Sequence, residues 1–257
     1  LANANGIMAD GTAEQAAVDA AESDLLAVIG RLVKKDIDLS SGLLLNTDFT
    51  SSTAAIDNEK NIITAGGYTI KPLGTSSIQD GYIQSATTKD TGKAGISLDT
   101  DLLKNAALES GLSFNVEWKF ENLFTGDTSD FGSLLGITDS SNKVLLMNTI
   151  GFVTVLKNGA DGGWYFPGSD CRNGFAWDSC KQYDNTTKKL TFTMDRTGYR
   201  MYVDGVLACE KTSMAGFDFA DMVSSAANIM IGRDCDETSR YYDIQGQLRG
   251  IQVYNRA

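Results

Sequence analysis

The stretch from Leu112 to Phe120 reads LSFNVEWKF and indicates the class of fold. Its apolar and polar residues alternate strictly: Leu112, Phe114, Val116, Trp118 and Phe120 are separated by Ser113, Asn115, Glu117 and Lys119. A period of two is typical of a β-strand, because successive side chains of a strand point to opposite faces. The stretch therefore predicts a strand with one face in a hydrophobic core and the other toward solvent.

The same period recurs on both sides of this stretch, from about Gly42 to the C-terminus. Further strands are predicted over 43–49, 62–70, 81–84, 133–138, 143–147, 152–157, 190–195, 199–203, 206–209, 228–232 and 247–254. Asp204-Gly205, between two apolar runs, predicts a two-residue hairpin turn, and Gly250 predicts a bulge in the last strand. Many strands without another convincing helix indicate an all-β protein, a two-sheet antiparallel jelly-roll sandwich.

The N-terminal segment follows a different period. Residues 12–35 predict an amphipathic α-helix, because Thr12 and Gln15 form a capping box and apolar residues recur at helical spacing. We therefore expect an N-terminal helical segment over 1–41 and a β domain over 42–257. The apolar face of the helix has two interpretations: it docks on its own β domain, or it contacts another subunit.

Composition excludes several partners and several kinds of chemistry. The chain has 22 Lys+Arg against 33 Asp+Glu, a net charge of −11, and this negative field repels phosphate backbones and anionic membranes. No apolar run approaches the length that spans a bilayer. We therefore expect neither nucleic-acid binding nor membrane insertion. The chain has no histidine, which excludes Ser-His-Asp and Cys-His nucleophiles and histidine metal ligands.

Three segments resemble a known family. They are LSFNVEWKF with the following LFTG and LLGI, the hairpin LTFTMDRTGYRMYVDGVLACE over 190–210, and the ending IMIGRDCDETSRYYDIQGQLRGIQVYNRA over 229–257. Together they resemble the laminin-G-like branch of the concanavalin A-like lectin/glucanase superfamily, over about residues 42–257. The resemblance implies a jelly-roll sandwich. It leaves the function open, because such folds serve as lectins, adhesion modules, glycan-binding modules, hydrolases and structural domains.

The longest stretch without a strand pattern, 158–189, is rich in aromatic residues and is the candidate ligand site. Aromatic faces beside Asn, Asp and Arg suit sugars, which present an apolar C–H face and a rim of hydroxyls. The candidate glycan-binding residues are Trp164, Tyr165, Asp170, Arg172, Asn173 and Trp177. The alternative interpretation is that these aromatic residues form a small core beneath the loop.

The four cysteines permit three disulfide pairings, and the sequence does not choose among them. We favour Cys171–Cys180, which lie within one loop, and Cys209–Cys235, which end two strands; both imply an oxidising compartment. Zinc is the competing interpretation. It lacks support, because the chain has neither a C-x₂-C pair nor a histidine.

Two further features are candidates for a metal ion and a modification. Asp234, Asp236 and Glu237 form an acidic cluster whose oxygen ligands suit Ca²⁺. The family resemblance supports Ca²⁺, since laminin-G-like domains often carry it at a loop rim, and the alternative is a solvated acidic turn. Asn185-Thr186-Thr187 is a candidate N-glycosylation site, meaningful only in a secretory pathway.

No catalytic constellation is visible in the sequence. Glycosidases use two carboxyl groups about 5–9.5 Å apart. The only acidic pair on the long strand that begins at Leu112, Glu117 and Glu121, is four residues apart, or about 13 Å. The E-x-D-x-x-E signature of related β-glucanases, G-x-S-x-G and the Walker loop are all missing. We expect no enzyme, with a glycoside hydrolase assembled from distant loops as a remote alternative.

The function expected from the sequence is a non-enzymatic, lectin-like adhesion module that binds a glycan or glycoprotein. It would be extracellular or surface-displayed: secreted, on a cell surface or on a virion. The start at Leu1 suggests a mature or excised chain. The alternative is a structural subunit of an extracellular filament, sheath or virion surface, which assembles with itself or with a neighbouring subunit through helix 12–35.

Overall fold

The structure, a computed structural model, describes only part of the chain. The described residues are 42–88, 92–104, 110–121, 131–149, 154–157, 164–165, 183–212, 218–233, 235 and 241–256. The expected helix over 12–35 and the segment 1–41 lie outside these residues, so both stay predictions. No helix of the described residues is long and apolar enough to cross a membrane.

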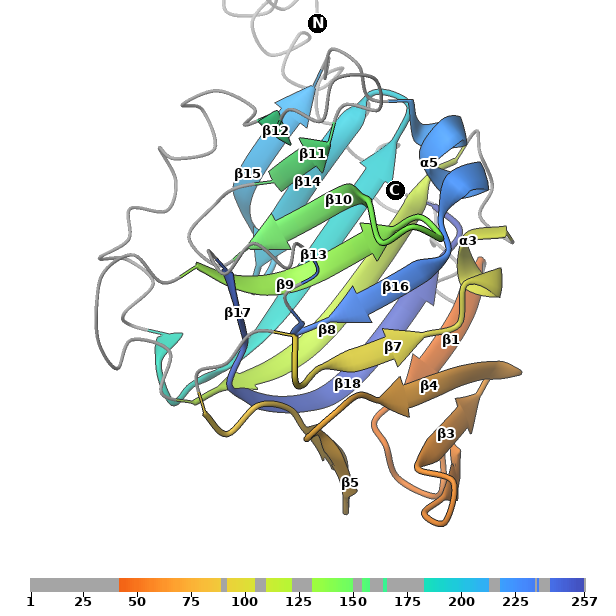
Figure 1. Cartoon of the computed structure of the whole chain (residues 1–257), viewed down its shortest axis with the longest axis vertical. Helices are drawn as coiled ribbons and strands as arrows, with labels where there is room; N and C mark the ends of the chain where they lie inside the picture. The colour runs from red at the N-terminus through yellow and green to blue at the C-terminus, as the bar shows by residue number, and fades with distance from the viewer. Residues whose placement is uncertain are drawn as a thin grey trace, which may run out of the picture. The chain divides into compact units, whose positions relative to one another are not determined.

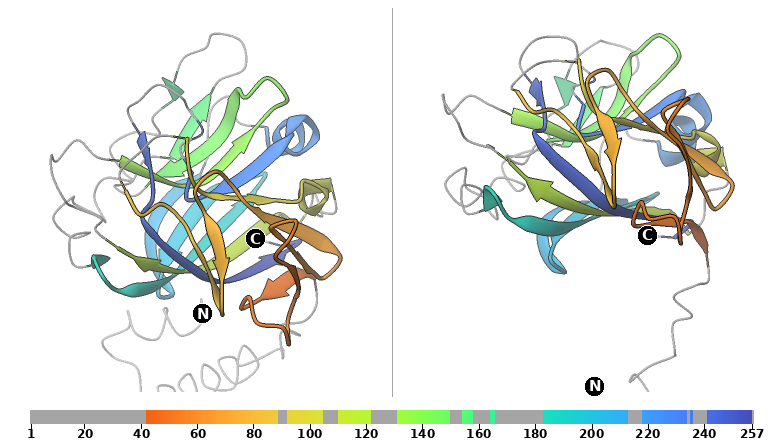
Figure 2. Two further views of the ribbon diagram at one scale, coloured as in Figure 1. Left: turned by 60° about the horizontal axis from the view of Figure 1, so that its bottom comes forward. Right: turned by 90° about the horizontal axis from the view of Figure 1, so that it is seen from below.

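The described strands form two sheets packed face to face (Figures 1 and 2). The first sheet has the order β15-β14-β13-β8-β18-β6-β5, with β1 also paired to β18. Its strands are β1 (Leu43–Thr47), β5 (Ser77–Gln79), β6 (Tyr82–Gln84), β8 (Leu112–Phe120), β13 (Thr187–Asp195), β14 (Gly198–Val203), β15 (Val206–Thr212) and β18 (Gly246–Tyr254). All its strand pairs are antiparallel, and the central pair β8–β18 joins segments far apart in the sequence.

The second sheet has the order β12-β11-β10-β9-β16-β7-β4-β3-β2. Its strands are β2 (Ala55–Asp57), β3 (Ile62–Ala65), β4 (Tyr68–Pro72), β7 (Ile96–Leu98), β9 (Phe131–Thr138), β10 (Val144–Thr149), β11 (Thr154–Lys157), β12 (Trp164–Tyr165), β16 (Asn228–Ile231) and β17 (Tyr241–Asp243). The strand β17 pairs with β9 in parallel, whereas the other pairs of this sheet are antiparallel.

The hydrophobic core lies between the two sheets. In β8 the burial pattern follows the predicted alternation: Phe114, Val116 and Trp118 are buried, while Asn115 and Glu117 are partly exposed on the outer face. Neighbouring strands contribute Phe192, Met201, Leu248 and Ile251 from the first sheet, and Ile96, Ile137 and Ile229 from the second. Burial of this apolar area supplies the main free energy that holds the sheets together, at about 25 cal/mol per Å².

The predicted all-β, two-sheet antiparallel sandwich is confirmed at this level. The Asp204-Gly205 turn is also confirmed, because both residues have positive φ, 50° and 79°, as a tight hairpin turn requires. The bulge at Gly250 is confirmed by a register shift between Leu248 and Gly250 against β8. The turn and the bulge depend on the conformation of neighbouring residues, so the local sequence pattern predicts them.

Some details differ from the sequence prediction. The strand predicted over 62–70 is divided into β3 and β4 by a turn at Gly66-Gly67, both of positive φ. The sequence indicated no helix after the first, yet two short ones occur: α3 (Asp101–Lys104) and α5 (Phe219–Ser225). They lie side by side at one end of the sandwich (Figure 1) and cover the core with buried apolar side chains. Helices this short show little periodicity, and α5 depends on its N-cap, Asp218, which accepts from two backbone N–H groups.

Candidate functional site

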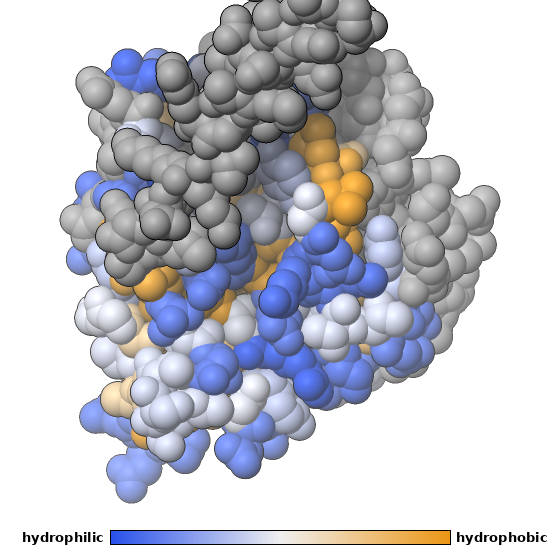
Figure 3. Space-filling view, turned by 180° about the vertical axis from the view of Figure 1, so that it is seen from behind, coloured by the Kyte–Doolittle hydropathy of each residue, from blue (hydrophilic) through white to orange (hydrophobic). Residues whose placement is uncertain are grey.

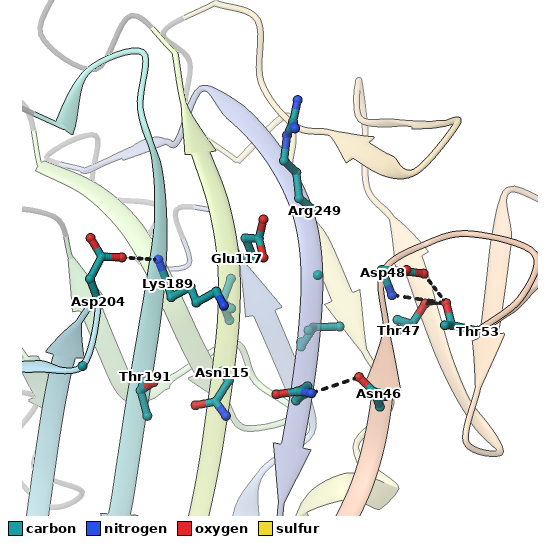
Figure 4. Close-up of a pocket in the computed structure, with 15 residues that line it drawn as sticks. Asn46, Thr47, Asp48, Thr53, Asn115, Glu117, Lys189, Thr191, Asp204 and Arg249 are labelled. Atoms are coloured by element: carbon teal, nitrogen blue, oxygen red, sulfur yellow. Dashed lines mark hydrogen bonds between the residues drawn. The ribbon is translucent and has the colours of Figure 1, made fainter.

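The outer face of the first sheet carries a pocket of about 530 Å³. The side chains that line it come mainly from β1, β8, β13 and β18 and from the turns at their ends (Figure 4). Seen from behind, where this sheet lies, the molecule is largely hydrophilic between smaller hydrophobic areas (Figure 3). The pocket is therefore a polar depression on the solvent side of a sheet whose other side forms the core.

Strand register arranges the pocket side chains in two rows across the sheet. In the first row, Asn115 of β8 lies opposite Thr191 of β13 on one side and Gln252 of β18 on the other. Asn46 of β1 continues this row opposite Gln252, and the Gln252 amide donates to its Oδ1 at 3.2 Å. The row thus presents amide and hydroxyl groups, which both donate and accept hydrogen bonds.

The second row pairs two opposite charges and ends in a gap. Glu117 of β8 lies opposite Lys189 of β13 on one side and Gly250 of β18 on the other. A Cβ added to Gly250 would meet only ordinary contacts, Thr47 O at 3.6 Å and Glu117 Cβ at 3.7 Å. The missing side chain at the bulge therefore leaves open space between neighbouring polar residues, and this space is part of the pocket.

The side chains at the centre of the pocket are not bonded to other described side chains. Within the described part of the chain, no hydrogen bond or ion pair joins the side chains of Asn115, Glu117, Lys189 or Thr191 to another residue. Polar groups grouped in a depression and uncommitted to the protein are free to bind a ligand.

Each end of the pocket carries an aspartate held by hydrogen bonds. The Asp204 carboxylate accepts from Lys188 Nζ at 2.8 Å and from Lys189 N at 3.0 Å. Partial burial would raise its pKa, but these hydrogen bonds outweigh burial and hold the pKa below its usual value. At the other end, the hydrogen bonds of Thr50 and then of Thr53 lower the pKa of Asp48 to about 2. Both rim carboxylates are therefore ionised at neutral pH.

Removing the Thr50 hydroxyl should raise the pKa of Asp48. Thr50 provides the largest contribution to the lowered pKa, so in Thr50→Ala the pKa of Asp48 should rise from about 2 toward the ordinary aspartate value of 3.8. An NMR titration that follows the Asp48 carboxyl carbon measures this pKa. Because the folded pKa is depressed, this interaction favours the folded loop above pH 3.8 and is lost as the pH falls through about 2. An unchanged midpoint would contradict this assignment, and Ser141→Ala, in another turn, is the control.

A hydrogen-bonded chain fixes Arg249 at the rim of the pocket. Its Nε and Nη2 donate to Gln247 Oε1 at 3.1 Å and 2.7 Å. The Gln247 amide in turn donates to Glu121 at 2.8 Å, and Glu121 also accepts from Lys119 and Gln84. Two of the five N–H donors of Arg249 are therefore committed to Gln247.

The candidate ligand residues predicted from the sequence lie elsewhere. Trp164 and Tyr165 form β12, which pairs with β11 in the second sheet, whereas the pocket is on the first. Asp170, Arg172, Asn173 and Trp177 lie outside the described residues. The loop site over 158–189 thus stays a prediction, separate from the pocket.

The other predicted sites are only partly described. Cys171, Cys180, Asp234, Asp236 and Glu237 lie outside the described residues, so the disulfides and the Ca²⁺ site stay predictions. Cys209 lies in β15, and Cys235 is buried with its Sγ close to Gly136 of β9. The described residues contain no cluster of three metal-ligating side chains. Asn185 of the glycosylation motif is exposed in a left-handed turn conformation, φ 57°.

Sequence reasoning missed the pocket, although two of its signals were visible. The alternation predicts a solvent-facing side of β8 with Asn115 and Glu117 on it, and Gly250 predicts a bulge. Neither signal reveals which residues of other strands lie beside them. Partners such as Thr191 and Gln252 are far away in sequence and become neighbours only through strand pairing.

Comparison with known proteins gives one family match. The model of the family described as "Sialidase, N-terminal domain" matches residues 93–257. No curated protein sequence matches the chain.

Solved structures give a likeness of fold. The sialidase of Trypanosoma rangeli in complex with sialic acid has 13% identity and a TM-score of 0.52 over 84% of this chain. The same enzyme with 2,3-difluorosialic acid gives the same identity and TM-score. A CBM40 domain of the Ruminococcus gnavus IT-sialidase, bound to alpha2,3 sialyllactose, has 18% identity and a TM-score of 0.43 over 68% of this chain. This chain spans only 31% of the length of the first of these proteins.

Proposed function

The chain belongs to the family of sialidase N-terminal domains, and on this premise we propose that it is a carbohydrate-binding module whose ligand occupies the pocket on the outer face of the first sheet. The proposal includes the finer features expected from the sequence. The fold is a lectin-type jelly roll, and the module is extracellular or surface-displayed and serves in adhesion to a glycan or glycoprotein.

The observation that carries the proposal is the set of uncommitted polar side chains at the centre of the pocket. Asn115 and Thr191 offer amide and hydroxyl groups side by side, and Glu117 and Lys189 add an acceptor and a donor in the next row. Sugar hydroxyls need such mixed donors and acceptors at close spacing. Directly opposite residues on neighbouring strands have Cβ atoms about 4.5–5.5 Å apart, so several of them can contact one sugar ring.

The proposed module is not an enzyme. General acid catalysis needs a carboxyl group whose pKa lies near the working pH. At both ends of the pocket, hydrogen bonds move the pKa of the aspartate in the opposite direction: Asp48 has a pKa of about 2, and the pKa of Asp204 is also lowered. Among the described residues that line the pocket, Glu117 supplies the carboxylate at its centre, whereas glycoside hydrolysis requires a pair.

A glycan array tests this function. We expect reproducible binding by the wild-type chain and binding weaker by about tenfold in Asn115→Ala/Thr191→Ala, since two hydrogen bonds contribute together about 1.4 kcal/mol. The matched control is Thr64→Ala/Ser97→Ala, which removes two hydroxyls from partly or fully exposed strand positions of the second sheet. It should bind as the wild type does.

Two outcomes of this experiment contradict the proposal. If the folded wild-type chain binds no glycan on the array, glycan binding is excluded as its function. Binding that survives in Asn115→Ala/Thr191→Ala and is lost in Trp164→Ala/Trp177→Ala places the ligand on the segment 158–189 instead of in the pocket.

A further inference from the structure

We infer that Gln247 and Glu121 are positioning residues, which hold the guanidinium of Arg249 at the pocket rim so that its remaining N–H groups contact the part of a glycan that extends past the pocket. This inference rests on the proposed function. It adds to the pocket centre a second contact region, which takes the next unit of an oligosaccharide.

The bulge in β18 places Arg249 on the outer face of the first sheet. Leu248 and Gly250 lie opposite consecutive residues of β8, Trp118 and Glu117, so Arg249 between them is the extra residue. The extra residue of a bulge loses its partner in the ladder, and its side chain takes a new direction. Arg249 is exposed and lines the pocket, and its side chain points away from Glu117 at the pocket centre (Figure 4). Its guanidinium therefore lies beyond the contacts proposed for the first sugar.

Two side chains hold this guanidinium in place. Gln247 Oε1 accepts from Arg249 Nε at 3.1 Å and from Nη2 at 2.7 Å. The ring of Tyr82 in β6 adds a cation–π contact, with Arg249 Cζ 5.9 Å from the ring centroid. Arg249 is therefore largely ordered before a ligand binds, which lowers the entropic cost of binding.

Glu121 fixes the orientation of the Gln247 amide. A carboxylate only accepts hydrogen bonds, and a guanidinium only donates them. The Gln247 amide lies between the two, so its Nε2 faces Glu121 at 2.8 Å and its Oε1 faces Arg249. Lys119 and Gln84 also donate to Glu121 and hold it in place. Because Gln247 is only 9% exposed, water does not readily replace these partners.

Arg249 keeps three N–H groups for a ligand. Within the described part of the chain, two of its five N–H donors bond to Gln247, so 5 − 2 = 3 remain, two on Nη1 and one on Nη2. Charged donors form stronger hydrogen bonds to sugar oxygens than neutral ones do. Gly250 has no side chain and leaves the pocket open beside Arg249. A glycan whose first sugar occupies the pocket centre therefore reaches Arg249 with its second unit.

The test compares two oligosaccharides with their terminal sugars by calorimetry: lactose with galactose, and sialyllactose with sialic acid. For a pair that the wild-type chain binds, Arg249→Met should weaken binding of the oligosaccharide by about tenfold and Gln247→Met by about threefold, while the affinity for the single sugar stays within about twofold. In the Arg249→Met background, Gln247→Met should cause no further loss, because Gln247 acts only through Arg249.

An exchange variant tests whether the hydrogen-bonded chain itself is responsible. Glu121→Gln/Gln247→Glu keeps an acceptor for Arg249 and supplies the donor from position 121, so it should bind the oligosaccharide as the wild type does. Exchange of the Arg249 Nε–H with solvent, followed by NMR, should be faster in Gln247→Met and return to the wild-type rate in the exchange variant. A merely structural role of Gln247 would not restore this rate.

Two matched controls come from positions outside the pocket. Arg200→Met removes an arginine of the same sheet, whose Nε donates to Glu210 at 2.7 Å. Gln79→Met removes an exposed glutamine of β5. Neither variant should change the affinity for any of the four sugars.

Contrary results distinguish this inference from the proposed function. An oligosaccharide that binds no more tightly than its terminal sugar, or equal losses for both in Arg249→Met, overturns the second contact region. Unchanged binding in Gln247→Met, or a folded exchange variant that does not restore binding, overturns the positioning role. Glycan binding in the pocket stands in each of these cases. If the folded wild-type chain binds none of the four sugars, this inference is overturned, and the glycan array decides separately whether the proposed function falls with it.

Discussion

Replacing Asp243 by alanine is expected to lower the free energy of unfolding by about 3–5 kcal/mol. Asp243 is the last residue of β17 and is only 2% exposed. Its carboxylate accepts from three consecutive backbone N–H groups: Gly92 at 3.0 Å, Lys93 at 2.7 Å and Ala94 at 2.8 Å. Alanine would leave these donors without their acceptor, two of them partly buried and that of Ala94 buried. Each unsatisfied buried donor costs about 1–3 kcal/mol.

Urea unfolding of Asp243→Ala and two further variants measures this effect. Asp243→Asn keeps one acceptor oxygen and brings an NH₂ group against the N–H donors, so its loss should be smaller than that of alanine but still above 1 kcal/mol. Asp80→Ala, at an exposed turn, is the control and should change the free energy by less than about 0.5 kcal/mol. A loss below about 1 kcal/mol in Asp243→Ala would show that these hydrogen bonds contribute little to the fold.

Filling the pocket with Gly250→Leu is expected to abolish glycan binding while the chain stays folded. The gap at Gly250 lies beside Glu117 in the second pocket row. A leucine side chain there would fill part of the pocket and exclude the proposed ligand. The backbone accepts the change, because Gly250 is not among the glycines of positive φ and a Cβ meets no atom closer than 3.6 Å. Leucine also has a higher strand propensity than glycine, so the melting temperature should hold or rise slightly.

The control for this variant is Ala55→Leu, which adds a leucine side chain at an exposed position of β2 in the second sheet. Binding on the array should fall by a hundredfold or more in Gly250→Leu, equivalent to about 2.7 kcal/mol, and stay at the wild-type level in Ala55→Leu. A Gly250→Leu chain that melts like the wild type and still binds the same glycans with the same affinity would exclude the pocket as the ligand site.

The partial success of sequence reasoning has a physical basis. Strand identity depends on local alternation, so β8 and β18 were predicted with bounds close to those observed. Three-residue strands such as β2, β5 and β7 carry too little pattern to be recognised, and their formation depends on a neighbouring strand that supplies hydrogen bonds. The turn before β4 was missed because Gly66-Gly67 was read as part of a longer strand.

The role of the Asp243 side chain could not be predicted from the local sequence either. In the sequence Asp243 lies six residues after Glu237, the last residue of the acidic cluster for which the sequence predicts Ca²⁺ ligation. In the structure its carboxylate binds backbone N–H groups of residues 92–94, about 150 positions earlier. Nothing in the local sequence indicates that the backbone of residues 92–94 needs an acceptor at this point.

The sequence pattern predicts the two-sheet β-sandwich, the residues of β8 that face the core, the Asp204-Gly205 hairpin turn and the bulge in β18. The position of β8 between β13 and β18 is known from the structure alone, and it brings Asn115 beside Thr191 and Gln252, and Glu117 between Lys189 and the gap at Gly250. The reason is that the period of a strand is a local property of its own residues. Its neighbours are chosen by backbone hydrogen bonds and core packing between distant segments, so a site built across strands has no contiguous trace in the sequence.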